Sequence, residues 1–190
     1  MMWPLTKMDD YLKENLKEQR YIHTLGVKDT AVSLASFYGE DAKKAEIAGL
    51  LHDCAKNLKN EELLNMALVS GFNVDLVSRS EPQLLHGLCG AIIAEKVMGV
   101  SDKYILDSII YHTTGRENMT KLDKIIYLAD YIEPNRNFQG VDFLRNLSYI
   151  DLDKAMLYAY DNTIKYVITK GKLIHMETIR GRNYILQRIR

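Results

Sequence analysis

Hydrophobic positions recur every three or four residues, with polar positions between them, over most of the 190-residue chain. This spacing is typical of helices with one apolar face, and no useful length of sequence alternates as a half-buried strand does. Only three prolines and eleven glycines interrupt the pattern, and no repeat, low-complexity tract or linker divides it. The pattern therefore predicts an all-α fold, a helical bundle forming a single domain over residues 1–190.

Capping residues and glycines set the expected ends of the helices. The expected helices cover about 6–18, 21–38, 41–55, 60–71, 84–97, 101–112, 120–133, 151–169 and 174–188. Their expected starting signals are capping boxes at Thr6 with Asp9 and Thr120 with Asp123, and single N-caps at Asp41, Asn60 and Ser101. Residues 74–82 are expected to be a loop that can hold a short helix, and residues 135–150 to be irregular.

Composition narrows the class of partner. Hydrophobic residues make up 47% and charged residues 26% of the chain, as in a soluble protein with a core. The 25 basic and 25 acidic residues cancel, which argues against a nucleic-acid polymer or a membrane as the main partner. The longest apolar stretch, residues 84–94, is too short to span a bilayer. Because the N-terminal residues do not resemble a signal peptide, we expect a cytoplasmic protein.

The two cysteines limit the kind of metal site that the chain can form. Cys54 and Cys89 each stand alone in apolar helical sequence, without a C-x-x-C or zinc-ribbon spacing. We expect them to be buried reduced thiols, although pairing in space stays open. Any metal must therefore be held by nitrogen and oxygen.

A histidine and a histidine–aspartate pair lie among apolar residues. His23 shares a helical stripe with Val27 and Ala31, where a single histidine is more often a hydrogen-bonded core residue than a ligand. His52 and Asp53 are adjacent, so on a helix they point about 100° apart and both can reach one ion. The alternative is that Lys56, three residues on, neutralises the Asp53 carboxylate.

Three further polar residues interrupt apolar helical segments. Asp130 follows Leu128 and Ala129, while His86 and His112 also lie in apolar surroundings. Burying so many imidazole and carboxylate groups is costly unless they share a partner, and a divalent metal can be that partner. The candidate ligands are His23, His52, Asp53, His86, His112 and Asp130. They suit one or two ions of iron, manganese, cobalt, zinc or magnesium.

The order of these residues resembles a known signature. His23, the His52-Asp53 pair and Asp130 follow the H…HD…D order of the HD-domain superfamily of metal phosphohydrolases. The strings at 50–56 (LLHDCAK), 128–136 (LADYIEPNR), 20–27 (RYIHTLGV) and 111–115 (YHTTG) are similar to the YqeK subgroup, the bacterial symmetrical diadenosine tetraphosphate hydrolases. The resemblance extends over about residues 20–179, with the HD core expected at about 20–135 and C-terminal helices at about 151–188.

This resemblance implies an HD-type helical bundle that hydrolyses diadenosine tetraphosphate symmetrically to two ADP, with iron as the expected metal. His23, His52, Asp53 and Asp130 match the family's ligands, and His86 and His112 match histidines that hold a second ion, with Asp53 as the bridge. Two such ions, about 3.5–4 Å apart, hold a bridging hydroxide as the nucleophile. His175 matches no ligand position and is interpreted as structural or solvent-facing.

The phosphates and nucleosides need further groups. Lys56, one turn from the His52-Asp53 pair, and Arg136, just after Pro134, are candidates to bind phosphate beside the catalytic Asp53. The remaining candidates for substrate contact are Arg20, His23, Gly26, Asn57, His86, His112, Thr113, Thr114, Arg116 and Asp130. Two alternatives remain, a broader nucleotide phosphatase or pyrophosphatase and a non-catalytic, metal-stabilised nucleotide-binding protein. The apolar faces of the C-terminal helices allow a homodimer.

Overall fold

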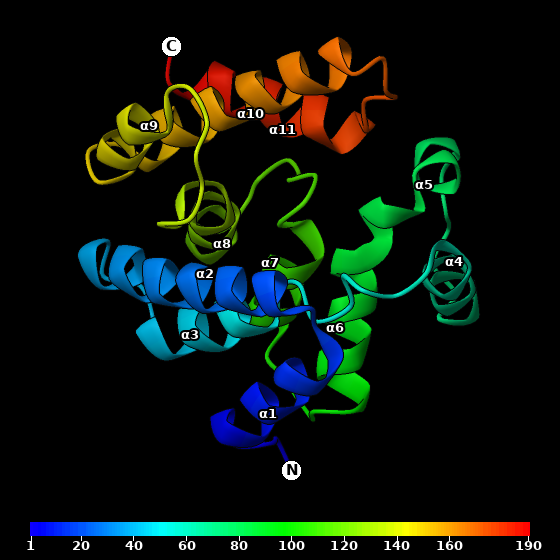
Figure 1. Ribbon diagram of the computed structural model, residues 1–190. Helices are drawn as coiled ribbons and strands as arrows, with labels where there is room; N and C mark the ends of the chain where they lie inside the picture. The colour runs from blue at the N-terminus through cyan, green and yellow to red at the C-terminus, as the bar shows by residue number, and fades with distance from the viewer.

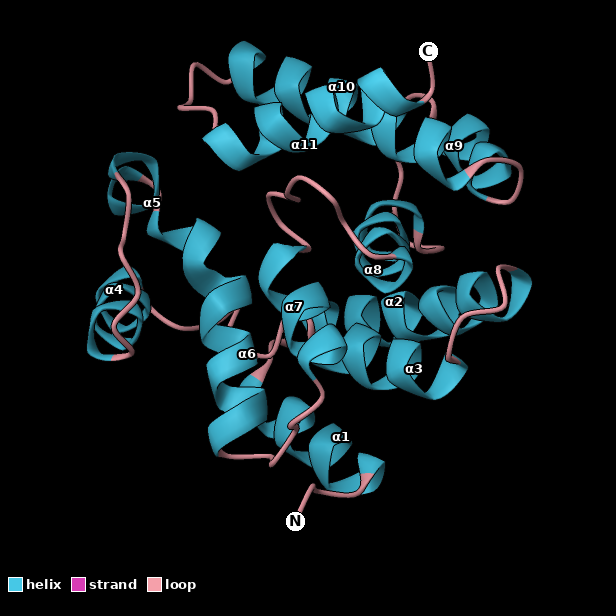
Figure 2. Cartoon of the chain, turned by 180° about the vertical axis from the view of Figure 1, so that it is seen from behind, coloured by secondary structure: helices cyan, strands magenta, loops and turns pink.

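The computed structural model describes residues 1–190 and contains eleven α-helices, one 3₁₀ helix and no strand (Figures 1 and 2). In chain order the elements are α1 (Leu5–Asn15), α2 (Glu18–Phe37), α3 (Ala42–Leu51), α4 (Asn60–Val69), α5 (Leu76–Ser80), η1 (Pro82–Leu85), α6 (His86–Lys96), α7 (Lys103–Tyr111), α8 (Lys121–Ile132), α9 (Val141–Ser148), α10 (Leu152–Thr169) and α11 (Met176–Arg188). The predicted all-α fold is confirmed. No helix combines the length and the apolar character needed to cross a membrane.

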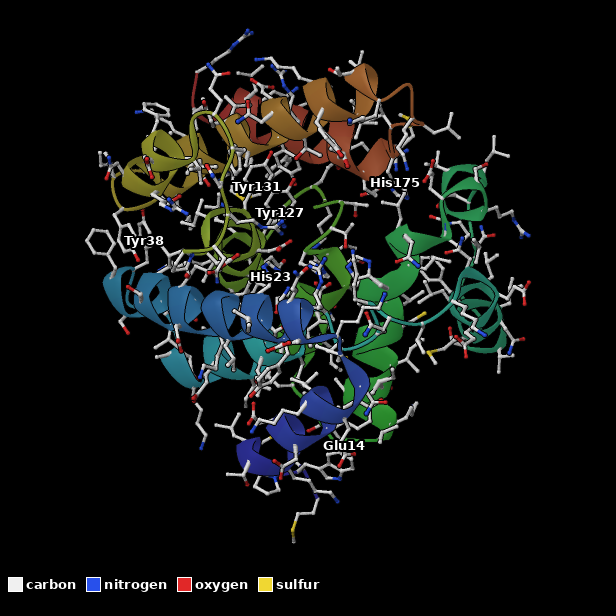
Figure 3. The ribbon with its side chains drawn as sticks, viewed as in Figure 1. Glu14, His23, Tyr38, Tyr127, Tyr131 and His175 are labelled. Carbon is white, nitrogen blue, oxygen red and sulfur yellow. The ribbon has the colours of Figure 1, made fainter.

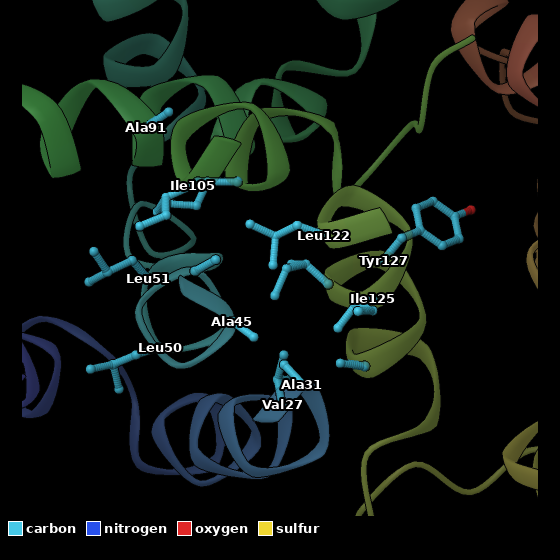
Figure 4. Close-up of a cluster of buried hydrophobic side chains, with 14 of the residues drawn as sticks. Val27, Ala31, Ala45, Leu50, Leu51, Ala91, Ile105, Leu122, Ile125 and Tyr127 are labelled. Carbon is cyan, nitrogen blue, oxygen red and sulfur yellow. The ribbon is translucent and has the colours of Figure 1, made fainter. Parts of the chain in front are cut away.

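The core lies where α2, α3, α7 and α8 meet. Val27 and Ala31 of α2, Leu51 of α3 and Ile125 of α8 belong to one cluster of buried side chains (Figure 4). Helix α2 packs most extensively on α3, and Gly49 makes this possible, since a Cβ there would lie 2.9 Å from the Cα of Lys28. The 3.6-residue period read from the sequence therefore places its apolar stripe against neighbouring helices, as expected for amphipathic helices.

A second layer covers one side of this core. Helices α9, α10 and α11 lie across the top of the molecule, with α8 beneath them (Figure 1). Figure 4 shows the ring of Tyr127, at the edge of the core cluster on α8, directed away from the other labelled side chains. Tyr127 and Tyr131, one turn apart on α8, therefore lie between the core and the upper layer (Figure 3).

The helix caps show which helix starts the local sequence alone could predict. Asp41 and the Thr120–Asp123 capping box form as predicted. The predicted cap at Thr6 is wrong, because α1 begins after Pro4. The predicted cap at Ser101 is also wrong, because the Asp102 carboxylate caps α7 by accepting hydrogen bonds from the backbone of Tyr104 and Ile105. Asn60 is the first residue of α4 rather than its cap. An aspartate beside a serine is an equally good cap, so the choice between them depends on local geometry.

Two element boundaries also differ from the prediction. Residues 135–150 are not irregular throughout, since α9 forms there with Leu144 fully buried. The Arg145 guanidinium donates to the carbonyl oxygens of Ile132, Glu133 and Arg136, which ties α9 to the end of α8. The expected helix at 84–97 begins as η1, so that α6 starts at His86. The short helix expected within residues 74–82 is α5.

Candidate metal centre

Helix ends bring the six candidate ligands together. His23 lies in α2, His52 and His112 follow the last residues of α3 and α7, and His86 begins α6. Asp53 lies in the turn after α3, and Asp130 is near the end of α8. Helix ends that meet at one point let side chains far apart in the sequence share a small volume.

The Asp53 carboxylate lies at the middle of this group. Its Oδ1 is 3.0 Å from Nε2 of His86 and 3.6 Å from Nε2 of His112. Its Oδ2 is 3.5 Å from Nε2 of His52 and 3.9 Å from Nε2 of His23. One buried carboxylate therefore faces four imidazoles through both of its oxygens.

Asp130 approaches the same group from the other side. Its Oδ1 is 3.0 Å from Nε2 of His23 and 4.0 Å from Nε2 of His52. Two sets of ligand atoms, each within 4.8 Å of one another, result: His23, His52 and Asp130, and His52, Asp53 and His112. The two sets share His52, whose Nε2 has one lone pair and can therefore bind one ion at a time.

The histidines are oriented through their other ring nitrogens. Nδ1 of His52 lies 2.7 Å from the carbonyl oxygen of Gly49, and Nδ1 of His112 lies 2.7 Å from that of Ile109. Nδ1 of His86 is likewise bonded to the carbonyl oxygen of Gln83. Because a carbonyl oxygen only accepts, Nδ1 carries the proton and the lone pair of Nε2 faces the centre. This is the tautomer that a metal ligand requires.

Glu133 orients His23 in the same way, and the sequence did not single it out. Its Oε1 lies 3.1 Å from Nδ1 of His23, and the residue is 1% exposed. Gly26 leaves the space for it, since a Cβ there would lie 2.5 Å from Glu133 Oε2. The position of Glu133, one turn after Asp130, could have indicated its contact with the site. Because Glu133 directly precedes Pro134, however, it resembled an ordinary residue at a helix end.

The buried atoms of the centre fit a divalent cation. Nε2 of His23, Nε2 of His52 and Oδ1 of Asp53 are buried and form no hydrogen bond of acceptable geometry within the protein. Buried polar atoms without a partner are rare, because each one loses its hydration without compensation. A cation bound by these nitrogen and oxygen atoms would compensate all three.

The charge states at neutral pH also suit metal binding. Burial acts to raise the pKa of Asp53, but the neighbouring His52, His112 and His86 outweigh it and hold the pKa well below its usual value. Burial likewise opposes ionisation of Asp130, whereas His23 and the charge of Arg136 hold its pKa well below the usual value. Burial lowers the pKa of His86 to about 4. Both carboxylates are thus ionised and His86 is neutral, as ligands must be.

Three cations surround the centre. An Arg20 guanidinium nitrogen lies 2.8 Å from Asp53 Oδ2, and Arg136 is paired with Asp130. Lys56 Nζ lies 3.3 Å from the ring nitrogens of His86. The Asp53 carboxylate is therefore neutralised by Arg20, and not by Lys56 as the alternative interpretation of the pair supposed. Burial lowers the pKa of Lys56, against the opposing effect of Asp53.

Two cavities open beside these cations, and both include Arg20, Lys56 and Arg136 in their walls. The first has a volume of about 550 Å³ and the second about 680 Å³. Thr113 lines the first cavity and Asn57 the second. Seven residues that line the first cavity were not among the site candidates named from the sequence: Tyr127, Tyr131, Phe138, Gln139, Asn162, Thr163 and Tyr166.

Other candidate residues lie elsewhere. Gly26 lines neither cavity, whereas Thr114 and Arg116 line a different one of about 710 Å³ between η1 and α11. The Arg116 guanidinium lies 2.8 Å from Asp123 and 3.1 Å from Asp107. His175 caps α11 by accepting a hydrogen bond from Glu177, as its structural interpretation predicted. Cys54 and Cys89 are buried free thiols, as expected.

Comparison with protein families agrees with the geometry. The model of the HD domain matches residues 20–135, which include all six candidate ligands. This chain belongs to the HD-domain family. Its histidines and aspartates follow the order from which the family takes its name, and the structure brings them to one point.

Similar HD-domain proteins extend over nearly the whole chain. The symmetrical bis(5'-nucleosyl)-tetraphosphatase of Bacillus subtilis is 42% identical over 92% of this chain and 94% of its own length. The protein of the same name from Staphylococcus aureus is 40% identical over 90% of this chain and 89% of its own. A crystal structure of a predicted HD superfamily hydrolase involved in NAD metabolism, from Clostridium acetobutylicum, matches with a TM-score of 0.97 and 52% identity, covering 99% of this chain and all of that one.

Proposed function

We propose that this HD-domain protein is a metal-dependent phosphoanhydride hydrolase that cleaves diadenosine tetraphosphate symmetrically into two ADP. The observation that carries the proposal is the buried Asp53 carboxylate, which is surrounded by the Nε2 atoms of four histidines and lines the first cavity. Relatives that are 40% and 42% identical over most of the chain carry the name of this activity.

The six ligands would hold one or two divalent cations, with iron as the proposed metal. His23, His52 and Asp130 would hold one ion and Asp53, His86 and His112 the other, with Asp53 close enough to both groups to bridge them. When bound, the cations lower the pKa of water and neutralise charge on the attacked phosphate. The Nδ1 hydrogen bonds keep each imidazole in the ligating tautomer, so no change of tautomer is needed before binding.

The chain's own cations would bind the polyphosphate. Arg20, Lys56 and Arg136 line both cavities, so a phosphate chain running between the cavities would pass all three side chains. Arg20 and Arg136 already contact the Asp53 and Asp130 carboxylates. A phosphate near the ligands therefore meets guanidinium groups that are held in place before it binds, and such groups stabilise developing charge without reorganising.

Symmetrical cleavage follows if the scissile bond is held at a fixed distance from one end of the substrate. One nucleoside diphosphate in a cavity would place its outer phosphorus beside Asp53, and the other half would then be the leaving group. A tetraphosphate split at this bond yields two identical products.

The test is a substrate panel on protein purified without oxygen, with the bound metal identified by elemental analysis. Diadenosine tetraphosphate should give ADP as the only nucleotide product on chromatography. ATP and AMP in equal amounts would contradict symmetrical cleavage, and faster release of phosphate from mononucleotides would favour a broader phosphatase. Tight nucleotide binding without any product would favour a non-catalytic binding protein.

A further inference from the structure

The two cavities beside the metal centre share their cations but differ in their walls. The first cavity, of about 550 Å³, includes four aromatic side chains: Tyr127, Tyr131, Phe138 and Tyr166. The second, of about 680 Å³, has none, and Ile22 is its one hydrophobic residue. A dinucleotide with two identical ends would therefore meet two unlike surfaces.

The aromatic wall is built from two layers of the fold. Tyr127 and Tyr131 stack along α8 with ring centres 6.4 Å apart, and Phe138 meets Tyr131 edge-on at 5.3 Å. Tyr166 reaches the cavity from α10 and is 61% exposed, so a face of its ring is free. An exposed aromatic ring beside a bound phosphate is a surface on which a nucleobase can stack.

Amide groups stand beside the aromatic rings. Gln139 and Asn162 line the same cavity and their side-chain amides have no hydrogen-bond partner within the chain, whereas Thr163 lies 3.4 Å from the Tyr127 hydroxyl. An amide both donates and accepts, which matches the N6 amino group and N1 or N7 of adenine. The wall thus offers stacking and hydrogen bonding together.

The second cavity suits a charged and hydrated group. Lys17, Gln19, Asn57 and Asn135 line it together with the three shared cations. Its walls hold four of the positive charges near the centre (Lys17, Arg20, Lys56 and Arg136) and Glu133 as the acidic residue. This composition favours phosphate and ribose over a stacked base.

The cavities also differ in how many ligands they reach. Asp53, His86, His112 and Asp130 line the aromatic cavity, whereas His23 is the one candidate ligand in the second. The half of the substrate in the aromatic cavity therefore brings its outer phosphate closest to the ligand cluster.

We propose that the aromatic cavity is a nucleobase site for the half of the substrate whose phosphorus is attacked, and that the polar cavity holds the departing half. The proposal rests on the proposed function. In the reaction an oxygen from water bonds to the outer phosphorus of the bound half, and a proton from that water is released. The bond from that phosphorus to the central bridging oxygen breaks, and the departing nucleoside diphosphate keeps this oxygen and its electron pair.

A mixed substrate makes the orientation measurable. Adenosine stacks more strongly than uridine, so adenosine–tetraphosphate–uridine should bind mainly with adenine in the aromatic cavity. Hydrolysis in oxygen-18 water followed by mass spectrometry should place most of the label in ADP and little in UDP. Equal labelling of ADP and UDP, or excess label in UDP, would overturn the assignment of the cavities.

Variants of Tyr166 test the aromatic wall without disturbing the core, because this residue is exposed on α10. Y166A should bring the labelling of ADP and UDP close to equal, whereas Y166F, which keeps the ring, should retain the parental bias. The matched control is Y104A, at a tyrosine of similar exposure (55%) on α7 that lies outside both cavities, and it should behave as the parent. If Y166A kept the parental bias in the labelling of ADP over UDP, Tyr166 would not be part of the nucleobase site.

A binding measurement separates this proposal from the proposed function. By calorimetry with the metal-loaded protein, Y166A should weaken ADP binding by roughly tenfold and leave inorganic pyrophosphate within about twofold of the parent. Equal weakening of both probes, or of neither, would contradict a base site even if ADP is the product. ATP and AMP as products would instead contradict symmetrical cleavage, while a selective loss of ADP affinity would still support the base site.

Discussion

Two clusters of imidazole, carboxylate and guanidinium groups occur in this molecule, and they differ in which buried atoms lack a hydrogen-bond partner. In the cluster around Arg116, each charged group has an opposite partner: Asp123 at 2.8 Å and Asp107 at 3.1 Å from Arg116, and Asp75 at 3.1 Å from His175. In the cluster around Asp53, the buried atoms without a hydrogen-bond partner are Nε2 of His23, Nε2 of His52 and Oδ1 of Asp53, all of them atoms of candidate ligands. In the cluster around Arg116 they are Nε of Arg116 and Oδ1 of Asp123, a donor and an acceptor that belong to one ion pair.

The difference separates structural charges from a binding site. An ion pair whose donor and acceptor groups face each other stabilises a particular packing of helices and needs no external ligand. Several buried ligand atoms without partners in one group are costly, and a bound cation would compensate them together. Residue types alone do not distinguish the two clusters, which is why Arg116 was a candidate for substrate contact on sequence grounds. Five predictions test the contrast, from the largest expected effect to the smallest.

Replacing Asp53 with alanine should remove activity with little loss of structure. The variant loses the carboxylate that faces four candidate histidine ligands and also a buried charge, so turnover should fall by at least about a hundredfold. The circular dichroism spectrum should remain helical. Product chromatography measures turnover, and activity above about a tenth of the parent would contradict the bridging role.

Replacing Arg116 with methionine should have the opposite signature. Asp123 is completely buried and would lose its partner, which costs about 3–5 kcal/mol in the free energy of unfolding. Turnover of the folded protein should stay near the parental value. Urea unfolding and product chromatography on the same sample check both parts, and lost turnover with unchanged stability would place Arg116 in the substrate site.

Lys56→Ala and Arg136→Ala should each weaken catalysis through lost charge stabilisation. The expected loss is roughly 2–4 kcal/mol in transition-state free energy, read from kcat/KM. Arg180→Ala is the matched control, because its guanidinium pairs with Glu177 on the surface. Parental rates in both Lys56 and Arg136 variants would show that neither side chain binds the reacting phosphates.

Removal of the metal should destabilise the protein. A ligand at a hundred times its Kd stabilises the folded state by about 2.7 kcal/mol, which corresponds to about 5–10 °C in Tm for a chain of this size. A chelator should therefore lower the parental Tm by this amount and leave Asp53→Ala nearly unchanged. Equal shifts in both proteins would indicate that the chelator acts elsewhere.

The paired cluster should show a small dependence on pH. Partial burial acts to raise the pKa of Asp75, but hydrogen bonds from Ser78 and the contact with His175 outweigh it and lower the pKa to about 2. A depressed carboxyl pKa contributes stability above the unfolded value of about 4, and this contribution is lost as the pH falls toward 2.

Asp75→Asn keeps the cap at the start of α5 and removes the charge. At pH 6 it should be less stable than the parent by under about 1 kcal/mol, after allowance for solvent screening. The difference should shrink between pH 4 and pH 2, as followed by urea unfolding at each pH. A difference that grows with acidity would contradict the sign of this shift.

Much of the fold and of the ligand set was readable from local sequence. Periodicity predicted the helical class, and Asp41 and the Thr120–Asp123 box marked helix starts correctly. The prediction failed for residues 135–150, where α9 is stabilised by the reach of Arg145 back to carbonyl groups at the end of α8. A contact of this kind depends on how two segments pack, which local propensity does not contain.

The aromatic cavity marks the limit of reading a site from sequence. Tyr127 and Tyr131 are one turn apart on α8, a spacing that also fits two core residues, and in the structure Tyr127 is 3% exposed. Their role depends on α10, which brings Asn162 and Tyr166 opposite them from about 35 residues further along the chain. The residues of α8 and α10 that line this cavity are distant in the sequence and become neighbours only when the helices pack.

The sequence by itself determined the helical period and the residue types that are costly to bury, because both depend on near neighbours and on the chemistry of single side chains. It therefore indicated His23, His52, Asp53, His86, His112 and Asp130 as a group. Only the tertiary structure decided that Arg20 pairs with Asp53, that Glu133 orients His23 and that Arg116 belongs to a separate, paired cluster. Those choices depend on which helix ends meet, and that is set by the packing of the whole core rather than by any local segment.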